Sequence, residues 1–488
     1  MRSALLAAAL VTLPDSLAQA QPILATPDGT GTQIIPQGQD FLIQGGTQSG
    51  ANLFHSFEQF GLNTGQAAIF LGNPDLANIL GRVTGGQVSV IDGLLQTQNT
   101  SANLYLMNPA GLVFGPNASL DLGGSFTATT ATAIGFGTSW FNATGPADYA
   151  TLVGSPNQFA FTGPIGGAIV NEANLGVNPG ESLTLLGGTV VNTGNLTAPG
   201  GLIQVRAVPG ESVVRLEQDG MVLALDLQPL PADGALTQGI NPLSLPELLT
   251  GGAVSHATAL VIDADGTVRL TSGGSAVTTG AGNVAFGGTA TVDAGSLRTG
   301  GQIQIMGENN LDFLGSVSAR GGDFGGDGGF IDLSGKETLN LVGDWFNRVD
   351  LAAPQGIAGT LLFDPNDITI VAGSVTGIGG SPANANTLGA ANISTFLNTN
   401  GSLVIATTGS GGSGDITLAS GAAISWTSSN NLTLNADRRI VLSGASITST
   451  SATGGNVTLN AQDINGGADL FLELIYKEIF KVDRGSPR

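Results

Sequence analysis

Residues 182–205 read SLTLLGGTVVNTGNLTAPGGLIQV, and this stretch decides the fold. In it, short runs of Leu, Ile, Val and Thr alternate with Gly, Asn and Pro, which favour turns. Similar units return at GDITL (414–418), NLTL (431–434), RIVL (439–442) and NVTL (456–459). The pattern predicts strands of roughly three to five residues, separated by turns at intervals of roughly 6–12 residues.

Strands this short cannot each form a hairpin around a sizeable core, but they can form the coils of a solenoid. In a parallel β-helix each coil contains two or three short strands, whose alternate side chains point into a narrow core. Neighbouring coils pair their backbones by stacking, and Gly and Asn suit the left-handed corners. We therefore expect an all-β, right-handed parallel β-helix, pectin-lyase-like in architecture, with short helical excursions.

The composition supports an ordered β-structure and excludes several other classes of protein. Charged residues make up 10% and hydrophobic residues 41% of the 488 residues, which is the opposite of the balance in disordered chains. The net charge of −21 offers no basic surface, so we expect no nucleic-acid partner. Cysteine is absent, which excludes thiolate nucleophiles, thiolate metal sites and disulfides. Packing and hydrogen bonds must therefore stabilise the fold.

The first 20 residues have the pattern of a removable secretory leader. Arg2 supplies the positive charge, Ala4–Leu13 forms an apolar run, and Ala18-Gln19-Ala20 is a small-x-small cleavage signal. A buried N-terminal helix is the alternative, but Pro14 and the shortness of the run disfavour it. We predict a signal peptide over residues 1–20. After residue 20 the sequence contains no run of about 18 apolar residues, which is the length that a membrane-spanning helix needs.

Three segments interrupt the repeats. Residues 226–250 contain four prolines and predict a loop insertion, and residues 374–400 predict a second insertion with a short helix near Ala390–Leu397. Residues 469–488 carry eight charged residues and place apolar residues at helical spacing, which predicts an atypical charged helical tail. The tail has two interpretations: a helical cap on the last coil, or a sequence accident such as a frameshift or truncation.

A more specific pattern surrounds two Asn-Pro turns. The surrounding segments are NLFHSFEQFGLNTGQAAIF (52–70), RVTGG (82–86) and FGPNASLDLGGSF (114–126). The first turn is Asn73, Pro74, Asp75 and Leu76, and the second is Asn108, Pro109, Ala110, Gly111 and Leu112. In this order the segments resemble the secretion domain of the filamentous haemagglutinin family, in its cyanobacterial version. The family motifs are Asn-Pro-Asn-Leu and Asn-Pro-Asn-Gly-Ile, so Asp75, Ala110 and Leu112 depart from them.

The resemblance continues at residues 319–336 and 361–371, which are similar to the repeats of haemagglutinin-like exoproteins. It implies export by two-partner secretion, through an outer-membrane barrel transporter with periplasmic recognition domains. It also implies a secreted or cell-surface protein of a Gram-negative bacterium, of cyanobacterial type, that acts in adhesion. The surface ligand stays open between a carbohydrate and other cells. We accordingly expect a secretion domain over 21–165, β-helix repeats over 166–468, and the two turn motifs as its functional residues.

Catalysis and metal binding are the competing interpretations. Pectinases share the β-helix fold, but the best carboxylate pair, Asp263 and Asp265 in IDADG, is typical of a turn. His55 and His256 lie in no nucleophile motif, and GGDFGGDGG (321–329) resembles a calcium-binding repeat in only one copy. We therefore predict no enzyme, cofactor or metal. The alternatives to an adhesin-type exoprotein are a β-helical polysaccharide-active enzyme and a truncated fragment of a larger exoprotein.

Overall fold

The computed structural model describes residues 23–163, 166–215, 281–341, 344–375, 386–409 and 412–466, with the backbone of five short strands elsewhere. These residues fall into two units: residues 1–197 with 204–290, and residues 198–203 with 291–488. The predicted tail, Asp263, Asp265 and His256 lie outside the described residues. So do the predicted leader and the loop at 226–250, apart from one two-residue strand in each.

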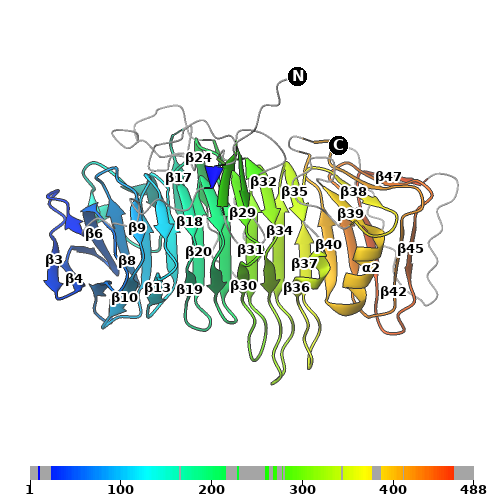
Figure 1. Ribbon diagram of the computed structural model, residues 1–488, viewed down its shortest axis with the longest axis horizontal. Helices are drawn as coiled ribbons and strands as arrows, with labels where there is room; N and C mark the ends of the chain where they lie inside the picture. Colours follow the sequence, from blue (N-terminus) through cyan, green and yellow to red (C-terminus); the bar gives the residue numbers. More distant parts are fainter. Residues whose placement is uncertain are drawn as a thin grey trace. The chain divides into compact units, whose positions relative to one another are not determined.

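The first unit is built from strands that stack in parallel. Its main sheet follows the order β6, β8, β11, β14, β20, and each neighbouring pair is parallel (Figure 1). These strands are β6 (Asn52–Gln59), β8 (Asn78–Val83), β11 (Asn103–Met107), β14 (Phe126–Thr129) and β20 (Ser182–Gly187). Asn52 pairs with Asn78, and Asn78 pairs with Asn103, so an asparagine occupies the equivalent strand position in three successive coils.

Further parallel sheets close these coils. One follows the order β4, β7, β10, β13, and another includes β9, β12, β18, β21 and β29. The strands of these two sheets are β4 (Asp40–Gly45), β7 (Ala67–Leu71), β10 (Leu94–Gln98), β13 (Ser119–Asp121), β9 (Ser89–Ile91), β12 (Leu112–Phe114), β18 (Ala168–Asn171), β21 (Thr189–Asn192) and β29 (Asn283–Phe286). A further parallel pair is formed by β19 (Asn174–Gly176) and β22 (Asn195–Thr197). The predicted all-β parallel β-helix is thereby confirmed.

An antiparallel sheet covers the outward face of the main sheet in the first unit, and the sequence analysis did not predict it. It contains β15 (Ala133–Phe136), β16 (Ser139–Asn142), β17 (Gln158–Phe161) and β24 (Ser212–Arg215), with the short helix η1 (Tyr149–Thr151) between β16 and β17. Buried aromatic and aliphatic side chains fill the space between the two layers: Phe54, Leu80, Tyr105, Met107, Leu186, Ile134, Phe136, Phe141, Phe159, Phe161 and Val214. This second apolar core fixes the antiparallel sheet to the coils.

Antiparallel strands also begin the first unit. β3 (Thr32–Gln37) pairs with β4, while β2 (Leu24–Ala25) and β5 (Thr47–Ser49) each pair with β6. The remaining short strands of this unit are β1 (Ala9–Leu10), β25 (Gln228–Pro229), β26 (Ala259–Ile262), β27 (Val268–Thr271) and β28 (Val277–Thr278).

The second unit repeats the parallel stacking. Its main sheet follows the order β31, β34, β37, β40, β43, β46 (Figure 1). These strands are β31 (Gln302–Gly307), β34 (Phe330–Gly335), β37 (Thr360–Phe363), β40 (Ser402–Ala406), β43 (Leu432–Asn435) and β46 (Val457–Asn460). The other faces are formed by β30 (Thr291–Asp293), β33 (Ser316–Ser318), β36 (Val349–Asp350), β32 (Asn310–Phe313), β35 (Thr338–Leu341), β38 (Ile368–Val371), β39 (Thr387–Gly389), β41 (Asp415–Leu418), β44 (Arg439–Leu442), β47 (Asp463–Gly466), β42 (Ala423–Trp426) and β45 (Ser446–Ser449). β23 (Leu202–Ala207) contains residues of both units.

One α-helix, α2 (Ala390–Thr399), interrupts the coils of the second unit beside β42 (Figure 1). The sequence predicted a short helix near Ala390–Leu397, so this excursion is confirmed. The helix buries Ile393, Phe396 and Leu397, and a 3-10 turn, η2 (Trp345–Asn347), places Trp345 against Phe396. No helix within the described ranges is long and apolar enough to cross a bilayer.

Candidate functional site

The first Asn-Pro motif forms an exposed turn between β7 and β8. The Asn73 side-chain carbonyl accepts a hydrogen bond from the Asp75 backbone N–H at 2.9 Å, and the Leu76 N–H donates to the Asn73 backbone carbonyl at 3.2 Å. Leu76 is buried, whereas Pro74 and Asp75 are exposed. The Asp75 carboxylate therefore contributes little to the turn, and the departure from the family motif at this position leaves the turn intact.

The second motif is buried and more fully bonded. Asn108 follows β11 and is fully buried, and its side-chain N–H groups donate to the Gln87 carbonyl and to Ser89 Oγ, both at 2.9 Å. Its side-chain carbonyl accepts the Ala110 N–H at 3.0 Å, and its backbone carbonyl accepts the Gly111 N–H at 3.0 Å. This one side chain therefore ties the corner after β11 to the preceding coil.

Two features explain the rest of this motif. Gly111 has a φ of 127°, a backbone conformation that other residues rarely adopt, and Leu112 begins β12 with its side chain fully buried. Ala110 is also fully buried.

The two motifs lie at opposite ends of the main-sheet strands, since the first precedes β8 and the second follows β11. No hydrogen bond among the described residues joins the two motifs, so the structure does not bring the nine predicted residues into one pocket.

A ladder of asparagine side chains runs along the beginning of the main-sheet strands. Asn78 Nδ2 donates to Asn52 Oδ1 at 2.8 Å, and Asn103 Nδ2 donates to Asn78 Oδ1 at 3.2 Å. Asn52 Nδ2 in turn donates to the carbonyls of Leu152 and Gly154, at 3.0 and 2.9 Å. The ladder therefore connects three coils to the segment that follows η1. Stacking of Asn at equivalent positions is expected of such coils, but these three residues were not singled out, although the recurrence of Asn before an aliphatic residue is a visible signal.

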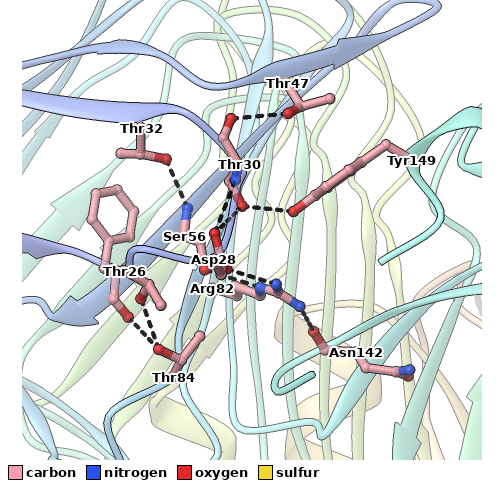
Figure 2. A network of polar contacts seen from close by, with 11 residues as sticks. Thr26, Asp28, Thr30, Thr32, Thr47, Ser56, Arg82, Thr84, Asn142 and Tyr149 are labelled. Atoms are coloured by element: carbon pink, nitrogen blue, oxygen red, sulfur yellow. Dashed lines mark hydrogen bonds and ion pairs between the residues drawn. The ribbon is translucent and has the colours of Figure 1, made fainter. Parts of the chain in front are cut away.

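A buried arginine links the N-terminal segment to the coils (Figure 2). The Arg82 side chain, on β8, is 1% exposed, and its Nη2 lies 2.8 Å from Asp28 Oδ2. Its Nε donates to Ser56 Oγ at 3.0 Å, and its Nη1 donates to the Asn142 carbonyl at 2.7 Å. The guanidinium also lies 5.1 Å from the centroid of the Phe141 ring. Arg82 thus contacts the first coil, the N-terminal segment and the antiparallel sheet at once.

The carboxylate of Asp28 completes this network. It accepts hydrogen bonds from the Thr30 N–H and hydroxyl, and the Thr30 hydroxyl lies 2.8 Å from the Tyr149 hydroxyl (Figure 2). Partial burial opposes ionisation of Asp28, but its hydrogen bonds with Ser56, Thr30 and Arg82 outweigh this and lower its pKa to about 2. Asp28 is therefore ionised across the physiological range and balances the buried charge of Arg82. No local sequence pattern relates the two residues.

His55 lies inside the first coils, on the opposite face of β6 from Phe54. It is fully buried, and its ring lies 6.1 Å from that of Phe57 and 5.9 Å from that of Phe70. Neither ring nitrogen has a hydrogen-bond partner among the described residues, and burial lowers the pKa of His55 to about 4. The imidazole is therefore neutral near pH 7, where it forms part of an aromatic core.

In the second unit, one carboxylate is perturbed in the opposite direction. Burial raises the pKa of Asp312, on β32, to about 6, although Asn340 Nδ2 donates to its carboxylate at 2.7 Å. Asp312 and Asn340 are neighbours in the parallel register of β32 and β35.

Within the described ranges, no group of three or more His, Asp or Glu side chains could hold a metal ion. The glycine-rich segment 321–329 lies in the loop between β33 and β34.

Comparison with known proteins identifies the N-terminal part of the chain. Residues 20–235 match the family model for the TPS secretion domain. No curated protein matches the chain. Among solved structures, the chain is similar to the HMW1 secretion domain from Haemophilus influenzae, with 16% sequence identity and a TM-score of 0.47. The alignment covers 92% of this chain and 96% of that one.

The family match defines the class of this part of the chain: residues 20–235 form a two-partner secretion domain, the domain that two-partner secretion exoproteins carry. Proteins with this domain are exported across the outer membrane of Gram-negative bacteria, with a dedicated outer-membrane transporter as their partner. The match begins at residue 20 and extends past the predicted domain boundary at residue 165. The position of that boundary, the role of the nine motif residues and a cyanobacterial origin stay predictions.

Proposed function

We propose that the protein is an adhesin-type exoprotein, whose first unit is recognised by the transporter and whose later coils present a binding surface outside the cell. The observation that carries this proposal is the division of the chain. The secretion-domain match ends at residue 235, and most of the second unit consists of stacked coils beyond it. These coils lie outside the secretion-domain match, so their surface can serve a function other than export.

The coils of the second unit have a surface suited to adhesion. On β43 and β46 the inward residues are apolar and buried, whereas Thr433, Asn435, Thr458 and Asn460 point outward. Asn460 Nδ2 donates to Asn435 Oδ1 at 2.7 Å, so these short polar side chains form a regular ladder. A flat surface that repeats its hydrogen-bonding groups from coil to coil can bind a repetitive ligand at several points at once.

For the secretion step, we propose that the buried motif Asn108–Leu112 and the exposed turn Asn73–Leu76 have different roles. Asn108 maintains the shape of the first coils, because its side chain is enclosed and satisfied by its own coil and the preceding one. The exposed turn at Pro74 and Asp75 is accessible to the periplasmic domains of the transporter. The structure of the early coils as a whole, rather than one pocket, then forms the recognition surface.

Co-expression with the cognate transporter tests the proposal. We expect the full chain to reach the medium or cell surface only when the transporter is present, and cells that export it to adhere more strongly to surfaces or to one another. Export without any gain in adhesion would contradict the adhesin role. Polysaccharide depolymerisation by the exported protein would instead support the enzyme alternative.

A further inference from the structure

Three consecutive loops of the second unit place large apolar side chains in solvent. They connect β30 to β31, β33 to β34 and β36 to β37, and they project side by side below the labels β30 and β36 (Figure 1). Leu297, Phe324 and Ile357 lie on these loops and are 69%, 76% and 73% exposed. They are the three most exposed large hydrophobic residues of the described chain. A soluble protein does not gain stability from such exposure, so the arrangement indicates an interaction surface.

Backbone contacts between the loops fix these side chains relative to one another. The Phe324 N–H donates to the Leu297 carbonyl at 3.3 Å, and the Gly328 N–H donates to the Ile357 carbonyl at 2.9 Å. Asp327 Oδ1 accepts the Ile357 N–H at 2.8 Å. The three tips therefore form one ordered surface, with Phe324 on the middle loop.

The glycines of segment 321–329 permit this close contact. A Cβ atom on Gly322 would lie 2.0 Å from the carbonyl carbon of Leu297, so no larger residue fits at this position. Gly326 has a φ of 106°, and a Cβ atom there would lie 2.5 Å from the Thr299 backbone nitrogen. The glycine-rich sequence is thus explained by the packing of adjacent loops, which hold Phe324 outward.

The same surface carries charges of both signs. Arg298 is exposed next to Leu297 and forms no ion pair within the described residues, and Asp323 is exposed next to Phe324. Asp327 is also exposed, beside the third loop. An anionic surface such as a phospholipid membrane would meet repulsion from the two carboxylates. A surface with the same mixture of apolar groups and opposite charges would not.

We propose that this loop-tip patch (Leu297, Phe324 and Ile357 with Arg298, Asp323 and Asp327) binds a second copy of the same chain. A two-fold axis through the middle loop places Phe324 against Phe324 of the second copy, and Leu297 against Ile357 of that copy. Arg298 then approaches the edge of the second copy that carries Asp327. The patch is therefore complementary to itself in polarity, and Arg298 of each copy is complementary in charge to Asp327 of the other, as a two-fold interface requires. This goes beyond the adhesin proposal and does not depend on it.

The size of the patch sets the expected strength of association. Three exposed side chains of this size supply about half of the roughly 800 Å² per partner that a standard interface buries. The net charge of −21 adds long-range repulsion between copies. We therefore expect a weak, reversible dimer, populated only at high protein concentration.

Sedimentation velocity of the exported full-length protein, from about 1 to about 100 micromolar, tests the proposal. We expect a concentration-dependent dimer, whose dissociation constant rises at least about tenfold in Phe324→Ser and also rises in Arg298→Glu. Val153→Ser is the matched control, since Val153 is 54% exposed but lies in the first unit, and it should dimerise like the wild type.

Two outcomes would overturn the inference: a wild-type protein that stays monomeric at every concentration, and a dimer that Phe324→Ser leaves unchanged. If the monomeric wild type, but not Phe324→Ser, bound a polysaccharide or neutral lipid vesicles, the patch would belong to that occupant instead. Because these exposed substitutions remove no buried contact, the variants should keep the β-sheet circular dichroism and melting temperature of the wild type.

Discussion

Arg82 Nη2 donates a hydrogen bond to Asp28 Oδ2 at 2.8 Å, although the two residues are 54 positions apart in the sequence. The contact fastens the segment before β3 to β8, and through Asn142 it reaches the antiparallel sheet as well. A buried guanidinium is costly without a counter-ion, so this pair makes the stability of the first coils depend on one carboxylate near the N-terminus.

The first prediction concerns that carboxylate. Asp28→Asn keeps the shape of the side chain but leaves the buried Arg82 charge uncompensated, which should reduce the free energy of unfolding by about 3 kcal/mol. Urea denaturation followed by circular dichroism measures the loss. Asp75→Asn is the control, because that exposed turn carboxylate should change stability by less than about 0.5 kcal/mol. Equal stability of the two variants would show that the ion pair contributes nothing.

The second prediction compares the two motif asparagines. Asn108→Ala removes three side-chain hydrogen bonds in a buried corner, which should cost about 2–3 kcal/mol and lower the secreted yield. Asn73→Ala removes one hydrogen bond in an exposed turn and should cost about 1 kcal/mol or less. Immunoblots of medium and periplasm, together with thermal melts, measure both effects. Normal export of Asn108→Ala would remove the motif's special role.

The third prediction is a loss of stability in mild acid. The pKa of His55 is about 4 in the fold, against an ordinary value of 6.5, so the unfolded chain binds more protons between these values. The free energy of unfolding should therefore fall by about 3 kcal/mol as the pH drops from 6.5 to 4. His55→Leu should lose this part of the pH dependence. If the variant and the wild type gave parallel stability curves across that window, His55 would not be its source.

The fourth prediction has the opposite sign. The pKa of Asp312 is raised from 3.8 to about 6, so the folded state binds more protons in that window and its stability falls as the pH rises through it. Asp312→Asn keeps an acceptor for Asn340 without the charge, and should stabilise the protein by about 2 kcal/mol at pH 7.5. At pH 4 the gain should largely disappear. A variant less stable than the wild type at pH 7.5 would refute this account.

The fifth prediction concerns export. The leader pattern ending in Ala18-Gln19-Ala20 predicts cleavage after Ala20, so the secreted chain should begin at Gln21. N-terminal mass spectrometry of the exported protein checks this, and secreted material that retained Met1 would contradict it. The periplasmic form that accumulates without the transporter should have the same N-terminus, because the leader is removed before the outer membrane is crossed.

The local features of the fold could be predicted from the sequence, and the distant contacts could not. The strand-and-turn rhythm at 182–197 corresponds to β20, β21 and β22, because each short run needs only its own turn residues to form. Helix α2 was predictable for the same reason. The turns at Asn73 and Asn108 also follow from local chemistry.

Other features depend on residues that are far apart in the chain. The antiparallel sheet joins β17 to β24 by pairing Phe159 with Val214, and nothing near either residue indicates the other. Arg82 and Asp28 are a second case, since a pair of opposite charges in the sequence carries no information on distance. The asparagine ladder is intermediate: Asn52, Asn78 and Asn103 recur at spacings of 26 and 25 residues, and a search for that period would have found it.

The parallel register of the coils has a consequence for the order in which an exported chain can fold. Asn103 pairs with a residue only 25 positions earlier, so a coil can close as soon as a short length of chain has emerged. The entropy lost on closing a loop of this length is modest, and it rises only slowly where a coil is longer, as between Phe126 and Leu183. Each finished coil is then a template for the next, because the backbone groups along its free strand edge can pair with the following strand. Assembly would proceed from the N-terminus, and a defect near Asn52 would halt every later coil, whereas one near Asn460 would spare all those before it.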